Sequence, residues 1–206
     1  MSVKFIAGRL CLDFVNTVGG RTEIVLRDKL NDYGDLLRFG QLSGSLPAAG
    51  ARRLARKAAN DSAEAAAVLA RARDLREALY RIFRSSIEAR RPAGSDLATL
   101  GEELSMARSH ERLAISSGAY IWAWDDEAAP DRVLWPVARS AAGLLTSSDM
   151  AALRQCAGET CGWLFLDSSR NHRRRWCDMK DCGNRAKVRR FRKRQQRSHR
   201  PRGSAK

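Results

Sequence analysis

The sequence predicts a mostly α-helical α+β protein that ends in a small, basic, cysteine-rich module. Three observations favour this fold class. Apolar residues recur at helical spacing through most of residues 1–153, one stretch there alternates as a β-hairpin does, and four of the five cysteines follow residue 154. A chain of 206 residues is long enough for two modules. We therefore expect a helix-rich domain over 3–150, a cysteine-rich module over 153–197 and a disordered basic tail over 198–206.

Helices account for most of the first domain, because its apolar period of three to four residues is that of an amphipathic helix. Asn60-Asp61 is expected to divide one long stretch into two helices, with Asp61 as the cap of the second. Ser95 or Asp96 is the expected cap of the helix after Pro92-Ala93-Gly94. The expected elements are an extended entry over 3–6 and helices over 10–18, 32–42, 48–91, 95–108 and 131–145.

Residues 112–125 change from a helical to an alternating period. Bulky residues there form two short runs on either side of Ser117-Gly118. Such runs around a turn pair predict a β-hairpin, which is the small β element of the domain. The bulky residues are Leu113, Ile115, Tyr120, Trp122 and Trp124.

Charge is concentrated where the cysteines are. Residues 1–153 carry 21 Lys+Arg against 19 Asp+Glu, whereas residues 154–206 carry 17 against 4. A cationic excess confined to one module indicates a polyanionic partner. The sequence shows no apolar run near the roughly 20 residues of a membrane helix and no signal-peptide pattern. We therefore expect a cytoplasmic protein with reduced thiols and no membrane partner.

The cysteines of the second module follow the pattern C-x4-C-x15-C-x4-C, and they are Cys156, Cys161, Cys177 and Cys182. Two close pairs separated by a mid-length spacer suit a tetrahedral structural metal site, and four thiolates favour zinc. Two disulfides and an iron–sulfur cluster are the alternatives. A reducing compartment argues against the first, and the spacing argues against the second. Cys11 stands alone in an apolar segment and is expected to be a buried hydrophobe.

The spacer between the cysteine pairs is expected to form a hairpin. Residues 163–166 have strand character, residues 168–171 have turn character, and residues 173–176 are expected to return as a second strand. Arg173 and Arg175 would then share one face, opposite Arg174.

A basic helix is predicted after Cys182. Val188 and Phe191 lie on one face of it with Asn184 and Gln195, and both are expected to pack on the hairpin. Seven cations within ten residues repel one another unless phosphates lie opposite, so we expect nucleic acid as the partner. The alternative is a solvated face that serves solubility alone. The expected nucleic-acid-binding residues are Arg173, Arg174, Arg175, Arg185, Lys187, Arg189, Arg190, Arg192, Lys193 and Arg194.

Residues 182–185 read CGNR and follow RRRWCDMKDC, with WLFLDSSRN earlier in the spacer. This composite resembles the CGNR zinc-finger family. The segment GRLCLDFVNT at residues 8–17 resembles the ABATE domain, which commonly precedes this finger in bacterial proteins. Together the resemblances cover about residues 3–195. They imply a stress-induced transcription regulator with one structural Zn²⁺.

The resemblance implies a treble-clef-like zinc finger, composed of a knuckle at Cys156 and Cys161, a hairpin, and a helix that starts near Cys182. Gly183 would let the backbone wrap close to the metal. Asn184 would hydrogen-bond across the finger, or serve structure alone. Arg185 and Lys187 would be free to meet phosphates or base edges.

A polar pocket for a small effector is the hypothesis for the first domain. The alternative is that its polar residues cap turns and that its tryptophans fill the core. The expected pocket residues are Arg9, Asp13, Asn16, Trp122, Trp124 and Arg139, with Thr17 and Trp135 beside them.

Three functional classes follow, of which a DNA-binding transcription regulator at the nucleoid is the first. An RNA-binding protein that uses the same finger is the second, because basic charge does not distinguish the two. An enzyme is not expected, because a four-cysteine site has no open coordination position and catalytic motifs are absent. A homodimer or additional contacts with the nucleic acid are expected, because a single finger helix binds weakly.

Overall fold

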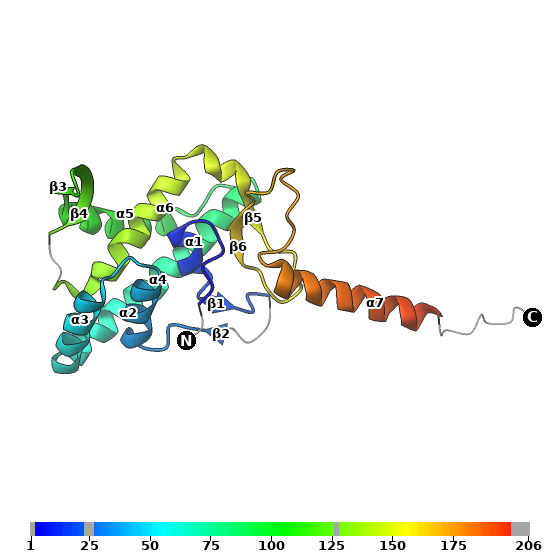
Figure 1. Ribbon diagram of the computed structural model, residues 1–206, viewed down its shortest axis with the longest axis horizontal. Helices are drawn as coiled ribbons and strands as arrows, with labels where there is room; N and C mark the ends of the chain where they lie inside the picture. The colour runs from blue at the N-terminus through cyan, green and yellow to red at the C-terminus, as the bar shows by residue number, and fades with distance from the viewer. Residues whose placement is uncertain (1–2, 23–26, 126–127, 199–206) are drawn as a thin grey trace, which may run out of the picture.

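The 26-residue helix α4 (Ser62–Ile87) is the element around which the first domain packs (Figure 1). It contacts most of the other helices of the domain and the first strand of the C-terminal module. The computed structural model describes residues 3–22, 27–125 and 128–198. Its other helices in this domain are α1 (Leu10–Val15), α2 (Tyr33–Leu42), α3 (Ala48–Asn60), α5 (Gly94–Ser109) and α6 (Leu134–Leu145). The tail predicted over 198–206 lies, apart from residue 198, outside the described residues.

Three antiparallel hairpins complete the fold of the described residues, so the α+β class is confirmed. The predicted hairpin is present as β3 (Glu111–Ser116) and β4 (Ala119–Trp124). The others pair β1 (Val18–Gly19) with β2 (Arg27–Asp28), and β5 (Leu153–Gln155) with β6 (Leu164–Leu166). Short 3-10 turns, η1 (Pro130–Val133) and η2 (Ser148–Ala152), flank α6. The chain ends in the π-helical turn η3 (Met179–Gly183) and helix α7 (Asn184–Ser198).

Side-chain caps fix some helix boundaries as predicted. Asp61 separates α3 from α4, and its carboxylate accepts a hydrogen bond from the backbone N–H of Glu64 at 2.8 Å. The predicted cap of α5 is wrong. That helix begins at Gly94 without a capping side chain, because the Asp96 carboxylate pairs with the Arg81 guanidinium at 2.6 Å instead. Helix α1 also ends three residues earlier than predicted, and residues 3–6 form no strand.

The hydrophobic core is continuous between the first domain and the C-terminal module. Strand β6 lies against the N-terminal segment, where the backbone N–H of Leu166 donates to the carbonyl of Ala7 at 2.9 Å. The buried Asn16 amide both donates to the Leu164 carbonyl, at 2.8 Å, and accepts from the Leu164 N–H, at 3.0 Å. The cysteines of the module belong to the same buried cluster as the aromatic core of the helices.

Replacing Asn16 with Ala is expected to lower the free energy of unfolding by about 2–4 kcal/mol. The truncation leaves a buried N–H and a buried C=O of Leu164 without partners, and each costs about 1–3 kcal/mol. Denaturant unfolding checks this. Asn31→Ala is the matched control, because its amide bonds the Asp35 carboxylate at the surface, and its effect should stay within about 0.5 kcal/mol. Equal losses in the two variants would contradict a core shared through Asn16.

The spacer between the cysteine pairs does not form the predicted hairpin. Strand β6 pairs with β5, which precedes the first cysteine, and residues 173–176 are not a strand. The physical reason is Asp167, whose buried carboxylate accepts hydrogen bonds from the backbone N–H groups of Ser169, at 3.0 Å, and Arg174, at 2.8 Å. These bonds organise the returning chain as a loop, in place of strand pairing.

Helix α7 projects away from the remainder of the protein (Figure 1). Val188 and Phe191 keep 50% and 61% of their surface exposed. The prediction that they pack on a hairpin is therefore wrong, because β5 and β6 face the helical domain and offer α7 no second apolar surface.

Candidate metal centre and nucleic-acid surface

The four cysteines predicted as metal ligands come together in one buried cluster, with all four sulfurs within 4.8 Å of one another. The Sγ atoms of Cys161 and Cys177 are 3.7 Å apart, and those of Cys177 and Cys182 are 3.8 Å apart. A tetrahedral ion with bonds of about 2.3 Å separates its sulfurs by about 3.8 Å. The thiol set and its dimensions fit a structural zinc ion, and none of the five cysteines forms a disulfide.

The cluster joins three separate segments. Cys156 and Cys161 flank the knuckle between β5 and β6, Cys177 ends the loop that Asp167 organises, and Cys182 lies in η3, just before α7. A zinc ion bound there fixes the first turn of α7 to the β5–β6 hairpin.

Glycine 158 is the residue that the knuckle requires. A Cβ atom at this position would lie 3.2 Å from the Cys182 sulfur and 3.4 Å from that of Cys156. Gly183 was predicted to let the backbone wrap close to the metal, and the structure corrects this. A Cβ atom at Gly183 would meet the Met179 sulfur at 2.7 Å instead. Sequence reasoning missed Gly158, although its place two residues after the first cysteine was a usable signal.

The sulfurs accept hydrogen bonds from surrounding N–H groups, which stabilises thiolates. The backbone N–H groups of Cys177 and Gly158 donate to the Cys156 sulfur at 3.3 and 3.4 Å, and Arg185 donates to the Cys182 sulfur at 3.5 Å. The hydrogen bond between Cys156 and Cys161 lowers the pKa of the first thiol and raises that of the second. Thiols this close share their protons, and a divalent cation replaces those protons.

The three consecutive arginines of the loop differ in exposure, although they do not form the strand from which a shared face of Arg173 and Arg175 was predicted. Arg173 and Arg175 are exposed, whereas Arg174 is half-buried. The Arg174 guanidinium lies 4.6 Å from the centre of the Phe165 ring and donates to the carbonyls of Trp176 and Cys177. Arg174 therefore supports the loop that carries the third metal ligand, and its neighbours remain available at the surface.

The cations of α7 fall into an anchored group and an unpaired group. Arg185 pairs with Asp181 at 3.0 Å, and Arg189 pairs with Glu159 of the knuckle. The exposed Asn184 amide donates to the Lys180 carbonyl at 3.1 Å, which is a bond within its own turn and not across the finger. The α7 cations that are exposed and make no ion pair within the described part of the chain are Lys187, Arg190, Arg192, Lys193 and Arg194.

A basic hollow of about 600 Å³ lies between α7 and the knuckle. Arg175 from the loop and Arg190, Lys193 and Arg194 from α7 line it, whereas Arg173 does not. The structure therefore brings Arg175 beside the unpaired cations of the helix, and Arg173 lies apart from them.

The residues expected to form an effector pocket in the first domain have different places. Asp13 is buried and accepts hydrogen bonds from the N–H groups of Ile6 and Ala7, both at 3.0 Å, and its burial raises its pKa to about 6. Asn16 binds the backbone of β6, as described above. Both side chains thus hold the N-terminal segment and do not line a pocket.

The other residues expected to form the effector pocket lie nearer to one another. Arg9, Trp124 and Arg139 line a shallow hollow of about 390 Å³, although Arg9 also pairs with Asp149. Trp122 lies outside the hollow and is 55% exposed, with the Arg139 guanidinium 5.7 Å from its ring centre. Trp135 is buried in the core.

Two protein-family models match consecutive parts of the chain. The ABATE family model, described as "Putative stress-induced transcription regulator", matches residues 8–148. The CGNR zinc-finger model matches residues 152–195. Neither description is that of an enzyme. No curated protein matches the chain. Within the described residues, no helix has the length and apolar character to cross a membrane.

Proposed function

The chain belongs to the ABATE family and carries a CGNR zinc finger, and on this basis we propose that it is a stress-induced transcription regulator that binds duplex DNA through α7. In this proposal the zinc ion sets the direction of α7, and the cations of α7 meet the phosphates. The protein acts in the cytoplasm, at the nucleoid.

The projection of the basic helix α7 away from the remainder of the protein is the observation that carries the proposal. Helix α7 has 15 residues, which span about 22 Å, and it contains no Asp or Glu. A helix of this kind fits a major groove about 12 Å wide. The unpaired cations would replace counterions along the phosphate backbone, which is the main source of affinity for DNA.

The exposed stripe of α7 is the face that we propose for contact with bases. Val188 and Phe191 lie in line with Asn184 and are bordered by cations on both sides of the helix. Apolar side chains contact the thymine methyl group in the major groove, and phosphate contacts carry no sequence information. Arg185 is engaged with Asp181 and the Cys182 sulfur, so we assign it to support of the finger and not to base reading.

Replacing Phe191 with Ala is expected to weaken binding to a selected DNA sequence by about 10- to 150-fold, because burying a Phe side chain against a base is worth roughly 1.5–3 kcal/mol. The dependence of affinity on salt should not change. Selection of bound fragments from random duplexes supplies the sequence, and titrations of both proteins measure the loss. Leu97→Ala is the control, because Leu97 is 46% exposed on α5, far along the chain from α7. A variant that keeps full affinity and full preference would remove Phe191 from the base-reading face.

RNA is the second candidate partner, and the exposure of Phe191 is the observation that favours it. RNA-binding proteins stack unpaired bases on exposed aromatic rings. Competition between duplex DNA and structured RNA for the zinc-loaded chain, at equal salt, decides between the two. Displacement of DNA by a lower concentration of RNA would assign the finger to RNA.

The proposal includes a regulatory role for the first domain, which would sense a ligand or form a dimer. Hairpin β3–β4 exposes Leu113, Ile115 and Tyr120 on one face, at 59%, 68% and 74%. Exposed apolar patches of this kind mark interaction sites. We expect a second copy of the chain to cover this hairpin, because two finger helices give a DNA site more contacts than one.

A further inference from the structure

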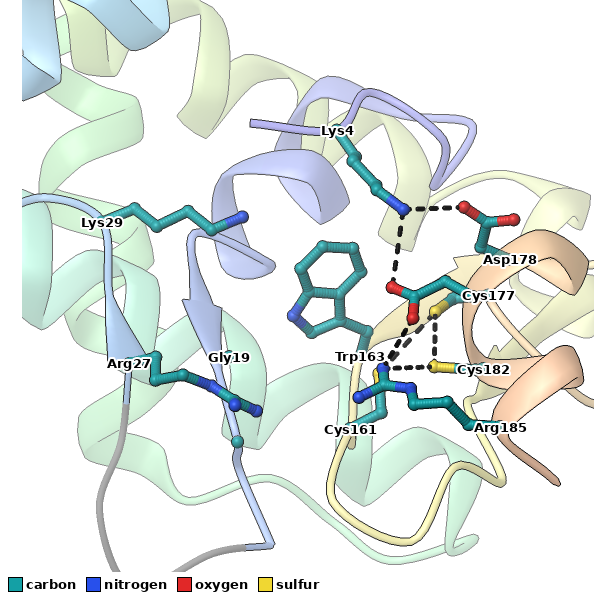
Figure 2. Close-up of a pocket in the computed structure, with 12 residues that line it drawn as sticks. Lys4, Gly19, Arg27, Lys29, Cys161, Trp163, Cys177, Asp178, Cys182 and Arg185 are labelled. Carbon is teal, nitrogen blue, oxygen red and sulfur yellow. Dashed lines mark hydrogen bonds and ion pairs between the residues drawn. The ribbon is translucent and has the colours of Figure 1, made fainter. Parts of the chain in front are cut away.

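A cavity of about 310 Å³ lies between the first domain and the metal-bearing turn (Figure 2). Strands β1 and β2 form one wall, and η3 with the start of α7 forms the other. Trp163 stands in the middle of the view, with Lys4, Lys29 and Arg185 around it. The expected effector pocket does not include this cavity.

Lys29 is the unusual residue of the cavity. It is half-buried, and its ammonium lies 5.0 Å from the centre of the Trp163 ring. This contact is its one side-chain partner within the described residues. Burial, with Lys4 and Arg27 nearby, lowers the pKa of Lys29. An ammonium that faces an aromatic ring keeps its N–H donors available for an anionic oxygen.

The carboxylates of the cavity are occupied by other cations. Asp178 accepts from Lys4 at 2.8 Å, and Asp181 pairs with Arg185 at 3.0 Å. Neither carboxylate is paired with Lys29. An anionic oxygen of a bound molecule would therefore be a hydrogen-bond acceptor for the Lys29 ammonium.

The walls of the cavity are fixed before any ligand arrives. The backbone N–H of Lys29 donates to the Thr17 carbonyl at 3.0 Å. The neighbouring Asp28 receives two bonds of 2.7 Å from the buried Arg76 guanidinium. The Trp163 indole N–H donates to the Val18 carbonyl at 2.8 Å, which fixes the orientation of its ring. A preformed site loses less entropy on binding than a mobile one.

We propose that this cavity binds a small organic anion, with its carboxylate or phosphate on the Lys29 ammonium and its apolar or aromatic body against Trp163. The metal ligands Cys161, Cys177 and Cys182 also line the cavity, and its volume lies at the lower end of the range of small-molecule sites, about 300–1,000 Å³. A charge-assisted hydrogen bond to an anionic oxygen is stronger than the contact of an ammonium with an aromatic ring at a partly exposed site. The bound anion contacts both the first domain and the turn that carries Cys182, and so it links them.

The test uses the zinc-loaded full chain and two probes, phenyl phosphate and phenylacetate, with neutral phenylacetamide as their comparison. The readout is the Trp163 indole N–H signal in a ¹H–¹⁵N NMR spectrum, which is assigned by its loss in Trp163→Phe. Each anion is expected to shift this signal saturably, and the amide is expected to leave it in place. No DNA is present, so the result does not depend on the proposed function.

Lys29→Gln is expected to weaken binding of both anions at least tenfold, because it removes a charge-assisted hydrogen bond. Lys57→Gln is the matched control, since Lys57 lies on α3 and pairs with Glu64. Zinc content and thermal melting show that both variants fold. The proposal is overturned if neither anion shifts the signal saturably, if Lys29→Gln binds them as wild type does, or if the amide binds as tightly as the anions.

Discussion

Removing the zinc ion is expected to unfold the C-terminal module and to abolish binding to DNA. A structural zinc site contributes about 10–16 kcal/mol of apparent binding energy at neutral pH, and most of this is folding energy. Without the ion, the buried cluster holds four thiols that crowd one another, and no disulfide joins Cys182 to the knuckle. Because the cysteines share a core with the helices, the melting temperature of the whole chain should fall as well.

Thermal melting of the chain with and without a chelator, with zinc measured on the same samples, checks this expectation. Cys177→Ser should behave as the chelated protein does. Cys11→Ala is the matched control, because Cys11 is buried in α1, where burial raises the pKa of its thiol to about 12. This variant should keep one zinc ion per chain. A chelated chain that melts as the loaded chain does, and still binds DNA, contradicts a structural role for the metal.

Replacing Arg190, Lys193 and Arg194 together with Gln is expected to lower DNA affinity on the order of 10²- to 10³-fold at 0.1 M salt. Each phosphate contact adds about 0.9 to the slope of log affinity against log salt concentration, so the slope should become less steep by roughly 3. These three residues line the basic hollow beside Arg175 and make no ion pair within the described residues. The loss should be equal for all DNA sequences.

The matched control for this variant replaces three exposed arginines of the first domain, Arg38, Arg52 and Arg56, with Gln. It removes the same charge from the protein but none from α7, so DNA affinity and slope should remain close to those of wild type. Titrations at several salt concentrations measure both quantities. If the two triple variants lose affinity equally, net charge and not α7 accounts for binding.

The metal ligands and most helices could be predicted from the sequence because they depend on local rules. Tetrahedral coordination by two turns imposes the spacing from Cys156 to Cys182, and helical packing imposes the apolar period of α4. Asp61 likewise caps α4 within four residues of chain.

The path of the spacer and the position of α7 could not be predicted, because they depend on distant contacts. The Asp167 carboxylate replaces strand pairing with a loop, and strand character in residues 163–166 does not reveal which strand is the partner. Val188 and Phe191 have the spacing of a packed face, but the hairpin that they were expected to cover does not form, and β5–β6 faces the first domain. The cavity at Lys29 brings together residues more than 150 positions apart along the chain, as in the ion pair of Lys4 with Asp178.

The most direct test of the central claim is a titration of the zinc-loaded wild-type chain into random-sequence duplex DNA at several salt concentrations, with molar mass measured on the same sample. Contact of six to eight cations with phosphates predicts a log–log slope of roughly −5 to −7. Chelation should abolish the binding. A chain with one tightly bound zinc ion that does not bind duplex DNA at low salt, or that binds it with no dependence on salt, would contradict the assignment of α7 as a DNA-binding helix.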